Sequence, residues 1–513
     1  MPFSEILKEL SEKQAKARSQ GGPEKIKRQH NAGRLTARER IAALLDNGSF
    51  LEFGALATSD IPGMEDRTPA DGLICGYGRI KGRLVGILAH DFTVLAATNA
   101  RINLKKLLQF KEHVLKSRVP MIWLAEAGGA RMPDCQGSKN ICSLGGGGVD
   151  TLMFEYTHFR TIPMLLGAMG ECYGVADFEA CLADFVVQVK GSAISVSGPR
   201  ALSRAIGQNY SGEEMGGWKV HDKITGMTDR IAENESHSFE LMKEFLDYMP
   251  SNNSQLPPRK EPTINEIDQS NILKYLPEKR NRTYDMHKII GCIVDDAKYF
   301  ELKPIFGDML ITCLARINGE VVGFIANNPL KNAGAMNTNG LDKHTSFLCL
   351  CDSFNIPIIF LHDTPGHMVG KKAEEARVGA KVVNNLQALF QVTVPKISIV
   401  IRKSYGQASI NMCGFGAGSD FFVAWPTAEI SFMEPLIAAD VVFGNKSEEE
   451  RVQFVSKMLD DASPYPAAQS YYIHDVIDPR ETRNYLKKVL KIIRESDSQG
   501  IGEHRLANWP TKF

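Results

Sequence analysis

Short apolar runs alternate with amphipathic segments along most of the chain. Residues 84–89 (LVGILA) and 120–125 (PMIWLA) are continuous apolar runs, a pattern typical of strands buried on both faces of a parallel sheet. Between them, residues 101–117 place apolar side chains at helical spacing, which predicts an amphipathic helix. Strands separated by helices favour parallel β-α-β units. The pattern therefore predicts an α/β fold.

An earlier helix has a clear start signal. Thr36 and Glu39 have the spacing of a capping box, in which each side chain accepts a hydrogen bond from the other residue's backbone. Ile41 and Leu44 then form an apolar face, and Asn47-Gly48 ends the pattern. We expect a short helix that begins directly after Thr36.

The chain also contains an internal repeat. Residues 79–89 (RIKGRLVGILA) recur as 316–326 (RINGEVVGFIA), at an offset of 237. Residues 161–176 match 393–408 at an offset of 232. Two further matches pair Val119-Pro120 with Ile356-Pro357 and residues 184–199 with 420–435. Four collinear matches at a nearly constant offset predict a duplicated β/α domain.

The segment between the two copies differs in composition. Residues 251–283 are polar, contain prolines and lack apolar periodicity, which is typical of a linker. The sequence therefore predicts an N-terminal domain at 1–250, a linker at 251–283 and a C-terminal domain at 284–513.

Length and charge narrow the class of protein. The chain has 513 residues, 60 Lys plus Arg and 60 Asp plus Glu, so its formal net charge is zero. Nucleic-acid binding needs an excess of clustered basic residues, so we expect no nucleic-acid partner. No apolar run approaches the ~20 residues that span a bilayer, and the first residues resemble neither a signal nor a transit peptide. A cytoplasmic protein without a membrane partner is expected.

Cysteine and catalytic motifs exclude several chemistries. None of the ten cysteines forms a C-x-x-C pair, so a zinc ribbon or thioredoxin-type motif is excluded. No G-x-S-x-G, H-E-x-x-H or P-loop sequence is present. His362, Asp363 and His367 lie close in sequence, but with a single carboxylate they favour a structural or substrate-facing role, so no metal is expected.

Glycine-rich turns follow the predicted strands in both copies. Gly128 and Gly129 follow the first strand, and Gly366 follows its counterpart, while Gly174 and Gly406 mark a second turn in each copy. Glycine lets the backbone approach a ligand closely, and adjacent N–H groups can stabilise an oxyanion. Alternatively, glycine only permits tight strand-to-helix turns. Recurrence in both copies favours a pair of oxyanion sites.

Three carboxylates are possible acid–base groups if the fold carries out α-proton chemistry. Glu126, Glu171 and Glu179 lie on or near the predicted strand ends. Taken alone, each one favours a solvated or salt-bridged side chain over a catalytic one.

Several segments together identify a family resemblance. Residues 33–52, 125–133 (AEAGGARMP), 214–229 and 476–486 are similar to carboxyltransferase (beta) subunits of biotin-dependent acyl-CoA carboxylases, of the propionyl-CoA and methylcrotonyl-CoA carboxylase type. The resemblance covers nearly the whole chain in order. It implies two tandem crotonase-like domains, the N-terminal one on the acyl-CoA side and the C-terminal one on the biotin side. It also implies a homo-oligomer, commonly a hexamer, with each active site between domains of two subunits.

The resemblance also implies roles for residues. Gly128 and Gly129 would hold the acyl thioester oxygen, and the N–H groups of Gln407 and Ala408 would hold the ureido oxygen of biotin. The acyl-CoA side would further include Ala130 and Gly174. The biotin side would further include Pro365, Gly366, Gly406 and Ile410. Gln407 stands where the family commonly has a second glycine.

Biotin would have to come from another polypeptide. The chain has no A-M-K-M-type biotinylation site and no ATP-binding pattern of a biotin carboxylase. We therefore expect biotin on a separate carrier protein or subunit, and a biotin carboxylase or biotin carrier subunit as partner.

The resulting hypothesis is transfer of a carboxyl group from carboxybiotin to the α- or vinylogous carbon of an acyl-CoA, by default a propionyl-like one. The first alternative is a biotin-linked decarboxylase component that runs the same half-reaction backwards. Another is a crotonase-type hydratase or isomerase with Glu126 or Glu171 as acid–base group. The last is a scaffold subunit without catalysis.

Overall fold

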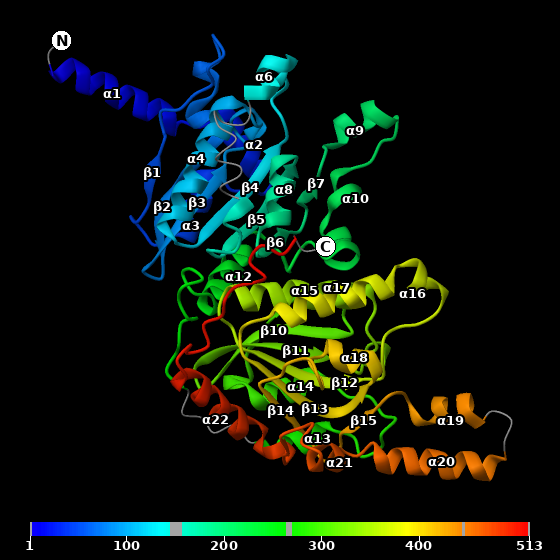
Figure 1. Ribbon diagram of the computed structural model, residues 1–513. Coiled ribbons are helices and arrows are strands. Elements are labelled where there is room, and N and C mark those ends of the chain that lie inside the picture. The colour runs from blue at the N-terminus through cyan, green and yellow to red at the C-terminus, as the bar shows by residue number, and fades with distance from the viewer. Residues whose placement is uncertain (1–2, 144–155, 263–268, 444–446, 511–513) are drawn as a thin grey trace. The chain divides into compact units, whose positions relative to one another are not determined.

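Two compact units make up the chain. The computed structural model describes residues 3–143, 156–262, 269–443 and 447–510. The chain divides into Met1–Asp247, called unit 1, and Tyr248–Phe513, called unit 2. Each unit is built on one eight-stranded sheet with helices around it (Figure 1).

The sheet of unit 1 has the strand order β1-β2-β3-β4-β5-β6-β8, and β7 pairs with β5. The first three strands pair antiparallel and the remainder parallel. The strands are β1 Leu51–Phe53, β2 Leu73–Ile80, β3 Arg83–His90, β4 Met121–Gly128, β5 Met164–Tyr173, β6 Phe185–Val189, β7 Ala193–Ser195 and β8 Arg230–Ala232. The helices are α1 Phe3–Arg18, α2 Pro23–Asn31, α3 Ala37–Leu44, α4 Arg101–Ser117, α5 Met132–Cys135, α6 Gly137–Ser143, α8 Val175–Leu182, α9 Pro199–Ile206, α10 Gly212–Gly216, α11 Trp218–Val220 and α12 Glu235–Tyr248.

The sheet of unit 2 has the order β9-β10-β11-β12-β13-β14-β16, and β15 pairs with β13. The strands are β9 Tyr299–Leu302, β10 Leu310–Ile317, β11 Glu320–Asn327, β12 Ile358–Thr364, β13 Lys396–Tyr405, β14 Phe421–Ala424, β15 Glu429–Ser431 and β16 Asp475–Val476. The helices are α13 Ile272–Tyr275, α14 Met286–Ile293, α15 Thr338–Ser353, α16 Lys371–Glu375, α17 Val378–Gln391, α18 Gly406–Asn411, α19 Pro435–Phe443, α20 Glu448–Asp461, α21 Pro464–Gln469 and α22 Thr482–Glu495.

The two sheets have the same topology, strand for strand. They even share an irregularity: the register shifts between Ala125 and Ala127 where β4 pairs with β5, and between His362 and Thr364 where β12 pairs with β13. Both shifts lie just before the first glycine turn of their unit. The predicted duplication of an α/β domain is confirmed.

Local signals predicted several elements closely. The helix expected at 101–117 is α4, and the apolar runs are β3 and β4. The capping box of α3 is formed, because the Thr36 N–H donates to Glu39 Oε2 at 2.7 Å and the Glu39 N–H donates to Thr36 Oγ1 at 3.4 Å. These features depend on neighbours in sequence, so the sequence alone determines them.

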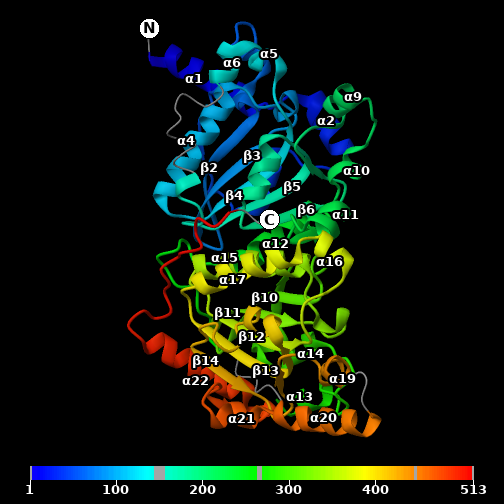
Figure 2. The ribbon, with the colours of Figure 1, turned by 45° about the vertical axis from the view of Figure 1, so that its right-hand side comes forward.

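In unit 2, helices cover both faces of the sheet (Figures 1 and 2). Apolar side chains of α14 and α22 pack against alternate residues of β10 to β14, such as Val322 and Phe324. Gly323 faces the opposite way, where a Cβ atom would lie 2.7 Å from Cys351 Sγ of α15. A sheet buried on both faces explains why its strands are continuous apolar runs.

The predicted linker packs on unit 2 where the structure describes it, and residues 263–268 lie outside the described part. Asn355 Nδ2 donates to the backbone oxygens of Asn253 and Gln255, at 2.8 Å each. Arg316 Nη1 donates to Pro258 O at 2.6 Å. This segment accordingly belongs to unit 2.

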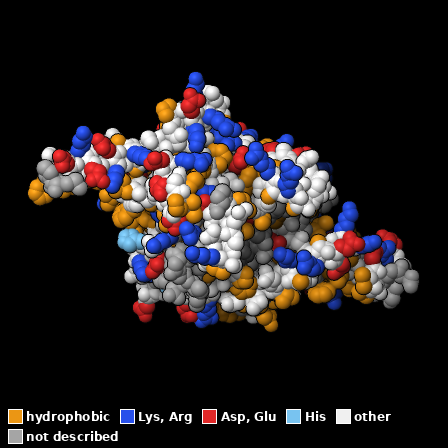
Figure 3. All heavy atoms as spheres, turned by 90° about the horizontal axis from the view of Figure 1, so that it is seen from above, with side chains coloured by type: hydrophobic (Ala, Val, Ile, Leu, Met, Phe, Trp, Pro, Cys, Tyr) orange, Lys and Arg blue, Asp and Glu red, His pale blue; other side chains and the backbone are white. Residues whose placement is uncertain are grey.

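Over the described ranges, none of the helices combines the length and the apolar character needed to cross a membrane. On the face drawn in Figure 3, basic and acidic side chains are interspersed, as expected for a chain with zero net charge.

Candidate active site

The first glycine turn of unit 1 leaves β4 with free backbone donors. Gly129 has φ +93°, a left-handed conformation that glycine adopts without a Cβ penalty. The Asn99 N–H donates to Gly129 O at 2.8 Å, and the Arg131 N–H donates to Asn99 O at 2.8 Å. Within the described residues, the N–H groups of Gly129 and Ala130 have no acceptor. This turn can therefore bind an acceptor from outside the chain.

The second turn of unit 1 lies against the first. Gly128 pairs with Tyr173 across β4 and β5, and a Cβ atom on Gly174 would lie 3.8 Å from the Gly129 Cα. The Gly174 N–H donates to Ser195 O at 3.2 Å, so it is already engaged. The structure thus brings Gly128, Gly129 and Gly174 together, with the free donors on the first turn.

The first turn of unit 2 differs from that of unit 1 in its backbone donors. Pro365 occupies the position of Gly128 and has no N–H. The Gly366 N–H donates to Thr364 Oγ1 at 3.3 Å, and Gly366 O accepts from Met336 N–H at 3.2 Å. This turn keeps the backbone course of its counterpart but has fewer free donors.

The second turn of unit 2 supplies those donors. The chain passes from β13 into α18, and the first N–H groups of a helix have no acceptor within it. No side chain in the described part of the chain caps α18, so the N–H groups of Gln407 and Ala408 are available. The Gln407 side chain is exposed, and Ile410 is half-buried beside the turn. Each unit therefore offers one set of backbone donors, at different turns of the same fold.

Gly406 is required where it stands. Its φ is +54°, and a Cβ atom would lie 2.8 Å from the backbone oxygen of Phe432. Any side chain at this position would displace either the turn or the segment before α19.

Glu126 is not a free acid–base group. Its Oε1 accepts from Arg34 Nη1 at 2.8 Å, and its Oε2 lies 2.6 Å from Arg40 Nη1. Gln29 Nε2 also donates to it at 2.8 Å, and the side chain is fully buried. Arg40 in turn binds Glu235 at 2.8 Å. Glu126 thus belongs to an ion cluster, which counts against the hydratase hypothesis.

Glu179 and Glu171, the other two predicted carboxylates, are no better placed to act as acid–base groups. Glu179 binds Lys111 Nζ at 2.6 Å through both oxygens, and the pair is buried. Glu171 is exposed on β5.

The two histidines near the first turn of unit 2, His362 and His367, are neutral groups within the fold. Burial lowers the pKa of His362 to about 3 and that of His367 to about 4. His362 Nδ1 lies 3.1 Å from Ser404 Oγ, and Asp363 Oδ1 accepts from the Lys403 N–H at 3.2 Å. In the part of the chain that the structure describes, no three His, Cys, Asp or Glu side chains are grouped as metal ligands.

Sequence analysis missed a polar cluster that fixes the second turn of unit 2. Arg280, from the predicted linker, donates to both oxygens of Glu429, at 2.8 and 3.1 Å. Tyr405 Oη donates to Glu429 Oε2 at 2.5 Å, and Tyr405 directly precedes Gly406. An arginine in a polar segment gives no sequence signal of a specific contact. Only the tertiary structure reveals that Arg280 binds Glu429.

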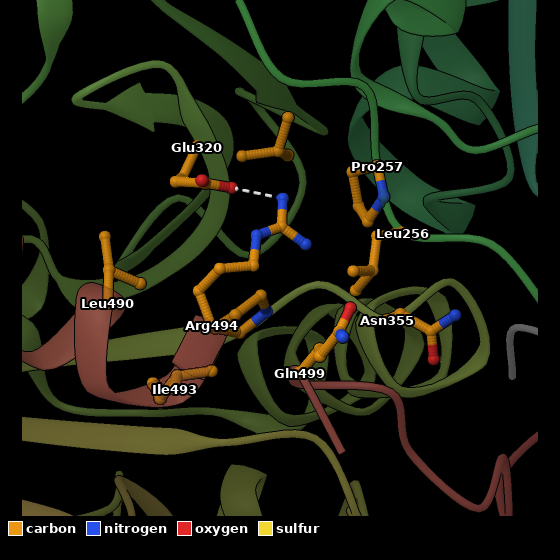
Figure 4. A pocket seen from close by; sticks show the side chains of 10 residues that line it. Leu256, Pro257, Glu320, Asn355, Leu490, Ile493, Arg494 and Gln499 are labelled. Carbon is orange, nitrogen blue, oxygen red and sulfur yellow. Dashed lines mark hydrogen bonds and ion pairs between the residues drawn. The ribbon is translucent and has the colours of Figure 1, made fainter. Parts of the chain in front are cut away.

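A small cavity of unit 2 lies away from these turns. Its volume is about 30 Å³, room for about one or two water molecules. Figure 4 shows it beside Arg494, which donates to Glu320 at 2.8 Å. The lining residues Asn355 and Pro357 precede β12, so the cavity lies at the strand end opposite the glycine turns.

Comparison with known proteins gives the family. A family profile described as the carboxyl transferase domain matches residues 28–505. The chain belongs to the carboxyl transferase domain family. The resemblance read from the sequence, and the class of enzyme it predicted, are confirmed.

Individual carboxyl transferase relatives match over nearly their full length. The chain is 35% identical to the methylmalonyl-CoA decarboxylase subunit alpha of Veillonella parvula, over 93% of this chain and 94% of that protein. It is 31% identical to the propionyl-CoA carboxylase carboxyltransferase subunit of Haloferax mediterranei, over 96% and 97%.

A crystal structure of transcarboxylase 12S, described as a hexamer with methylmalonyl-coenzyme A and methylmalonic acid bound, superposes with a TM-score of 0.89 at 30% identity. The match covers 96% of both chains. The expected fold class, two tandem crotonase-like domains, is confirmed by this match.

Proposed function

We propose that this chain is the carboxyltransferase subunit of a biotin-dependent enzyme, moving a carboxyl group between biotin and the α- or vinylogous carbon of a short acyl-CoA. One observation carries the proposal: a chain matched by the carboxyl transferase family over residues 28–505 presents free backbone donors at corresponding ends of two duplicated sheets. Two oxyanions, one on each reaction partner, need two such sets.

On the acyl-CoA side, unit 1 would bind the thioester oxygen through the turn at Gly128, Gly129 and Ala130. Donors fixed by the fold need no reorganisation when charge develops on that oxygen, so they stabilise an enolate more than the ground state. Gly174 completes the site by allowing the second turn to approach Gly129 closely. Backbone donors make a side-chain nucleophile unnecessary.

On the biotin side, the residues fit the group. A ureido carbonyl is a hydrogen-bond acceptor, and the N–H groups of Gln407 and Ala408 have no intrahelical acceptor. When bound, biotin supplies the carboxyl group to be transferred or accepts it. Gly406 lets the backbone approach, while Pro365, Gly366 and Ile410 flank the turn. Gln407 keeps its donor despite its side chain, because the donor is the backbone N–H.

We assign biotin to a separate carrier subunit and a homo-oligomeric, hexameric and cytoplasmic state to the protein. Apolar side chains on and just before α19 support an assembly, since five of them are more than half exposed. They are Phe432, Leu436, Ile437, Val441 and Val442.

The acyl group and the direction of carboxyl transfer are inferred from different observations. A propionyl-like chain is the default substrate, because the relatives named above act on methylmalonyl-CoA or propionyl-CoA. Decarboxylation is the second candidate, favoured by 35% identity to a decarboxylase subunit compared with 31% to the carboxylase subunit. Both directions use the same donors, so the partner subunit would decide between them.

The test needs only the purified chain. It is mixed with free biotin and with methylmalonyl-CoA, or with malonyl-, ethylmalonyl-, methylglutaconyl- or glutaconyl-CoA, and loss of the carboxylate is followed. We expect biotin-dependent decarboxylation, fastest with methylmalonyl-CoA. Failure with every thioester, in the presence of a biotinylated carrier as well, would refute the proposal.

Changing Arg280 to Lys should weaken the biotin side selectively. Lysine cannot make the two parallel hydrogen bonds that Arg280 makes to Glu429, so the turn after Tyr405 loses a support. The KM for free biotin is expected to rise severalfold while the KM for acyl-CoA stays unchanged. Equal changes in both constants would show that the cluster supports the whole fold rather than this turn. Arg259→Lys, at an exposed pair with Glu320, is the control.

A further inference from the structure

Asp177 is a buried carboxylate beside the acyl-CoA turns. It lies in the first turn of α8, and its N–H donates to Gly174 O at 2.9 Å. Residues three apart on a helix are neighbours, about 5–6 Å between Cβ atoms, so Asp177 is one turn away from the glycine that contacts Gly129. The residue is only 4% exposed.

The side chain of Asp177 has no partner among the residues that the structure describes. No hydrogen bond or ion pair joins its carboxylate to them, although other buried carboxylates of unit 1, such as Glu126 and Glu179, each bind a cation. Neither carboxylate oxygen is among the fully buried polar atoms that lack a partner in the described residues, so a small part of the carboxylate is open to solvent or to a ligand. Burial alone raises the pKa of Asp177 to about 6.

Charged neighbours do not account for the raised pKa of Asp177. Helix α8 packs on β4, β5 and β7, and Lys111 of α4 binds its Glu179. The titratable residues of the three strands are Glu126 on β4 and Glu171, Cys172 and Tyr173 on β5, and α8 itself adds Glu179 and Cys181. Glu126 and Glu179 are neutralised by buried cations, and Glu171 is exposed. Asp177 therefore titrates as an isolated group.

The duplicated fold does not require a carboxylate here. The offset of 232 between the copies places Ser409 of α18 at the corresponding position. Ser409 is buried and accepts a hydrogen bond from Ser404 Oγ at 2.7 Å. Unit 2 thus has a hydrogen-bonded hydroxyl where unit 1 has an acid without a partner among the described residues, so the acid is a feature of the acyl-CoA side alone.

We propose that Asp177 is an acid–base group of the acyl-CoA site, able to remove and return the α-proton of a thioester held at the Gly128–Gly129 turn in the absence of biotin. This rests on the function proposed above for that turn. Titratable groups with a perturbed pKa cluster where they act on a ligand, and an acid whose pKa lies near neutrality can both accept and release a proton.

The step balances without a further reagent. The α-C–H bond breaks and an O–H bond forms on the Asp177 carboxylate. The C–H electron pair forms the enolate C=C bond, and the thioester oxygen gains the negative charge beside the backbone donors. The reverse step returns a proton to the carbon. In D₂O the acid exchanges its proton with solvent, so deuterium enters the acyl chain.

The experiment follows deuterium entry into the α-position of propionyl-CoA by mass spectrometry, with the full-length protein in D₂O and no biotin. We expect the unchanged protein to catalyse exchange, and D177N to lower its rate roughly hundredfold. Glu171→Gln is the matched control, an exposed carboxylate close to the same turn, and is expected to keep the rate. Loss of exchange in E171Q but not in D177N would overturn the proposal.

Stability separates this role from a structural one. Because burial raises the pKa of Asp177 in the folded state, its ionisation costs stability, and the free energy of unfolding falls as pH rises from about 4 to about 6. D177N should therefore melt at a higher temperature than the unchanged protein at pH 8 and at the same temperature at pH 4. Asp177→Ser, which copies unit 2, is the second variant.

Binding of propionyl-CoA, measured by calorimetry, distinguishes failure of the proposed role of Asp177 from failure of the proposed function. Binding without exchange by the unchanged protein would overturn the role of Asp177 and leave the proposed function standing. Absence of binding would overturn the proposed function, and the role of Asp177 with it.

Discussion

Replacing Gly129 by Ala is expected to lower kcat for carboxyl transfer roughly hundredfold, the scale of losing one oxyanion donor. A Cβ atom at this position would meet only the Tyr173 Cβ, at 3.9 Å, so steric exclusion is not the cause. The φ of +93° is one that an L side chain rarely adopts. Relaxing it would turn the free N–H groups of Gly129 and Ala130 away from the thioester. Steady-state kinetics of the biotin-dependent reaction measure the effect.

Gly82→Ala is the matched control for this variant. Gly82 lies in the turn between β2 and β3, has φ +78° and has open space where its Cβ would stand. Both substitutions impose similar backbone strain, of about 1–2 kcal/mol, and both should lower the melting temperature. Only G129A should lower kcat. Equal kcat in the two variants would show that the turn at Gly129 does not hold the reacting oxygen.

Changing Arg40 to Met is expected to cost about 3–5 kcal/mol of unfolding free energy, as for other broken buried ion pairs. The Arg40 side chain is 1% exposed and lies between Glu126 and Glu235. Its removal leaves Glu235 without its ion-pair partner and Glu126 with Arg34 alone. Urea unfolding, followed by circular dichroism, measures the loss.

The comparison for Arg40 is Arg38→Met. Arg38 binds Glu52 at 2.9 Å, but the two side chains are 24% and 14% exposed, so water screens the pair. Its removal should cost about 1 kcal/mol or less. A similar loss in the two variants would contradict the ion-cluster interpretation. The cluster holds the end of β4, because Glu126 precedes Gly128 by two residues and accepts hydrogen bonds from Gln29 of α2 and from Arg34.

The ion cluster around Glu126 packs tightly against β5. A Cβ atom on Gly170 would lie 2.3 Å from Glu126 Oε1 and 2.7 Å from Arg34 Nη1. The glycine on the neighbouring strand thus makes room for the two charged groups. A hydratase using Glu126 would need that carboxylate free to reach a substrate, whereas two arginines hold it within the cluster.

The sequence by itself determined the periodic and local features. Strands buried on both faces must be continuous apolar runs, so β3 and β4 were predictable, and a capping box involves residues three apart, so the start of α3 was too. The duplication is visible because both copies must satisfy the same packing. Glycine turns at strand ends followed from the same repeat, since few other residues allow such backbone conformations.

Only the tertiary structure decided how the turns are used. Whether an N–H is free depends on partners far along the chain: Ser195 engages the Gly174 N–H in unit 1, whereas no acceptor among the described residues meets the Gly129 N–H. The same holds for the polar groups. Glu126 is paired by Gln29 and Arg34, which precede it by 97 and 92 residues, and Arg280 reaches Glu429 from a segment that looks like a linker. The same packing leaves Asp177 without a partner among the described residues. Charge and hydrogen bonding act through space, and their outcome is set only when distant segments meet.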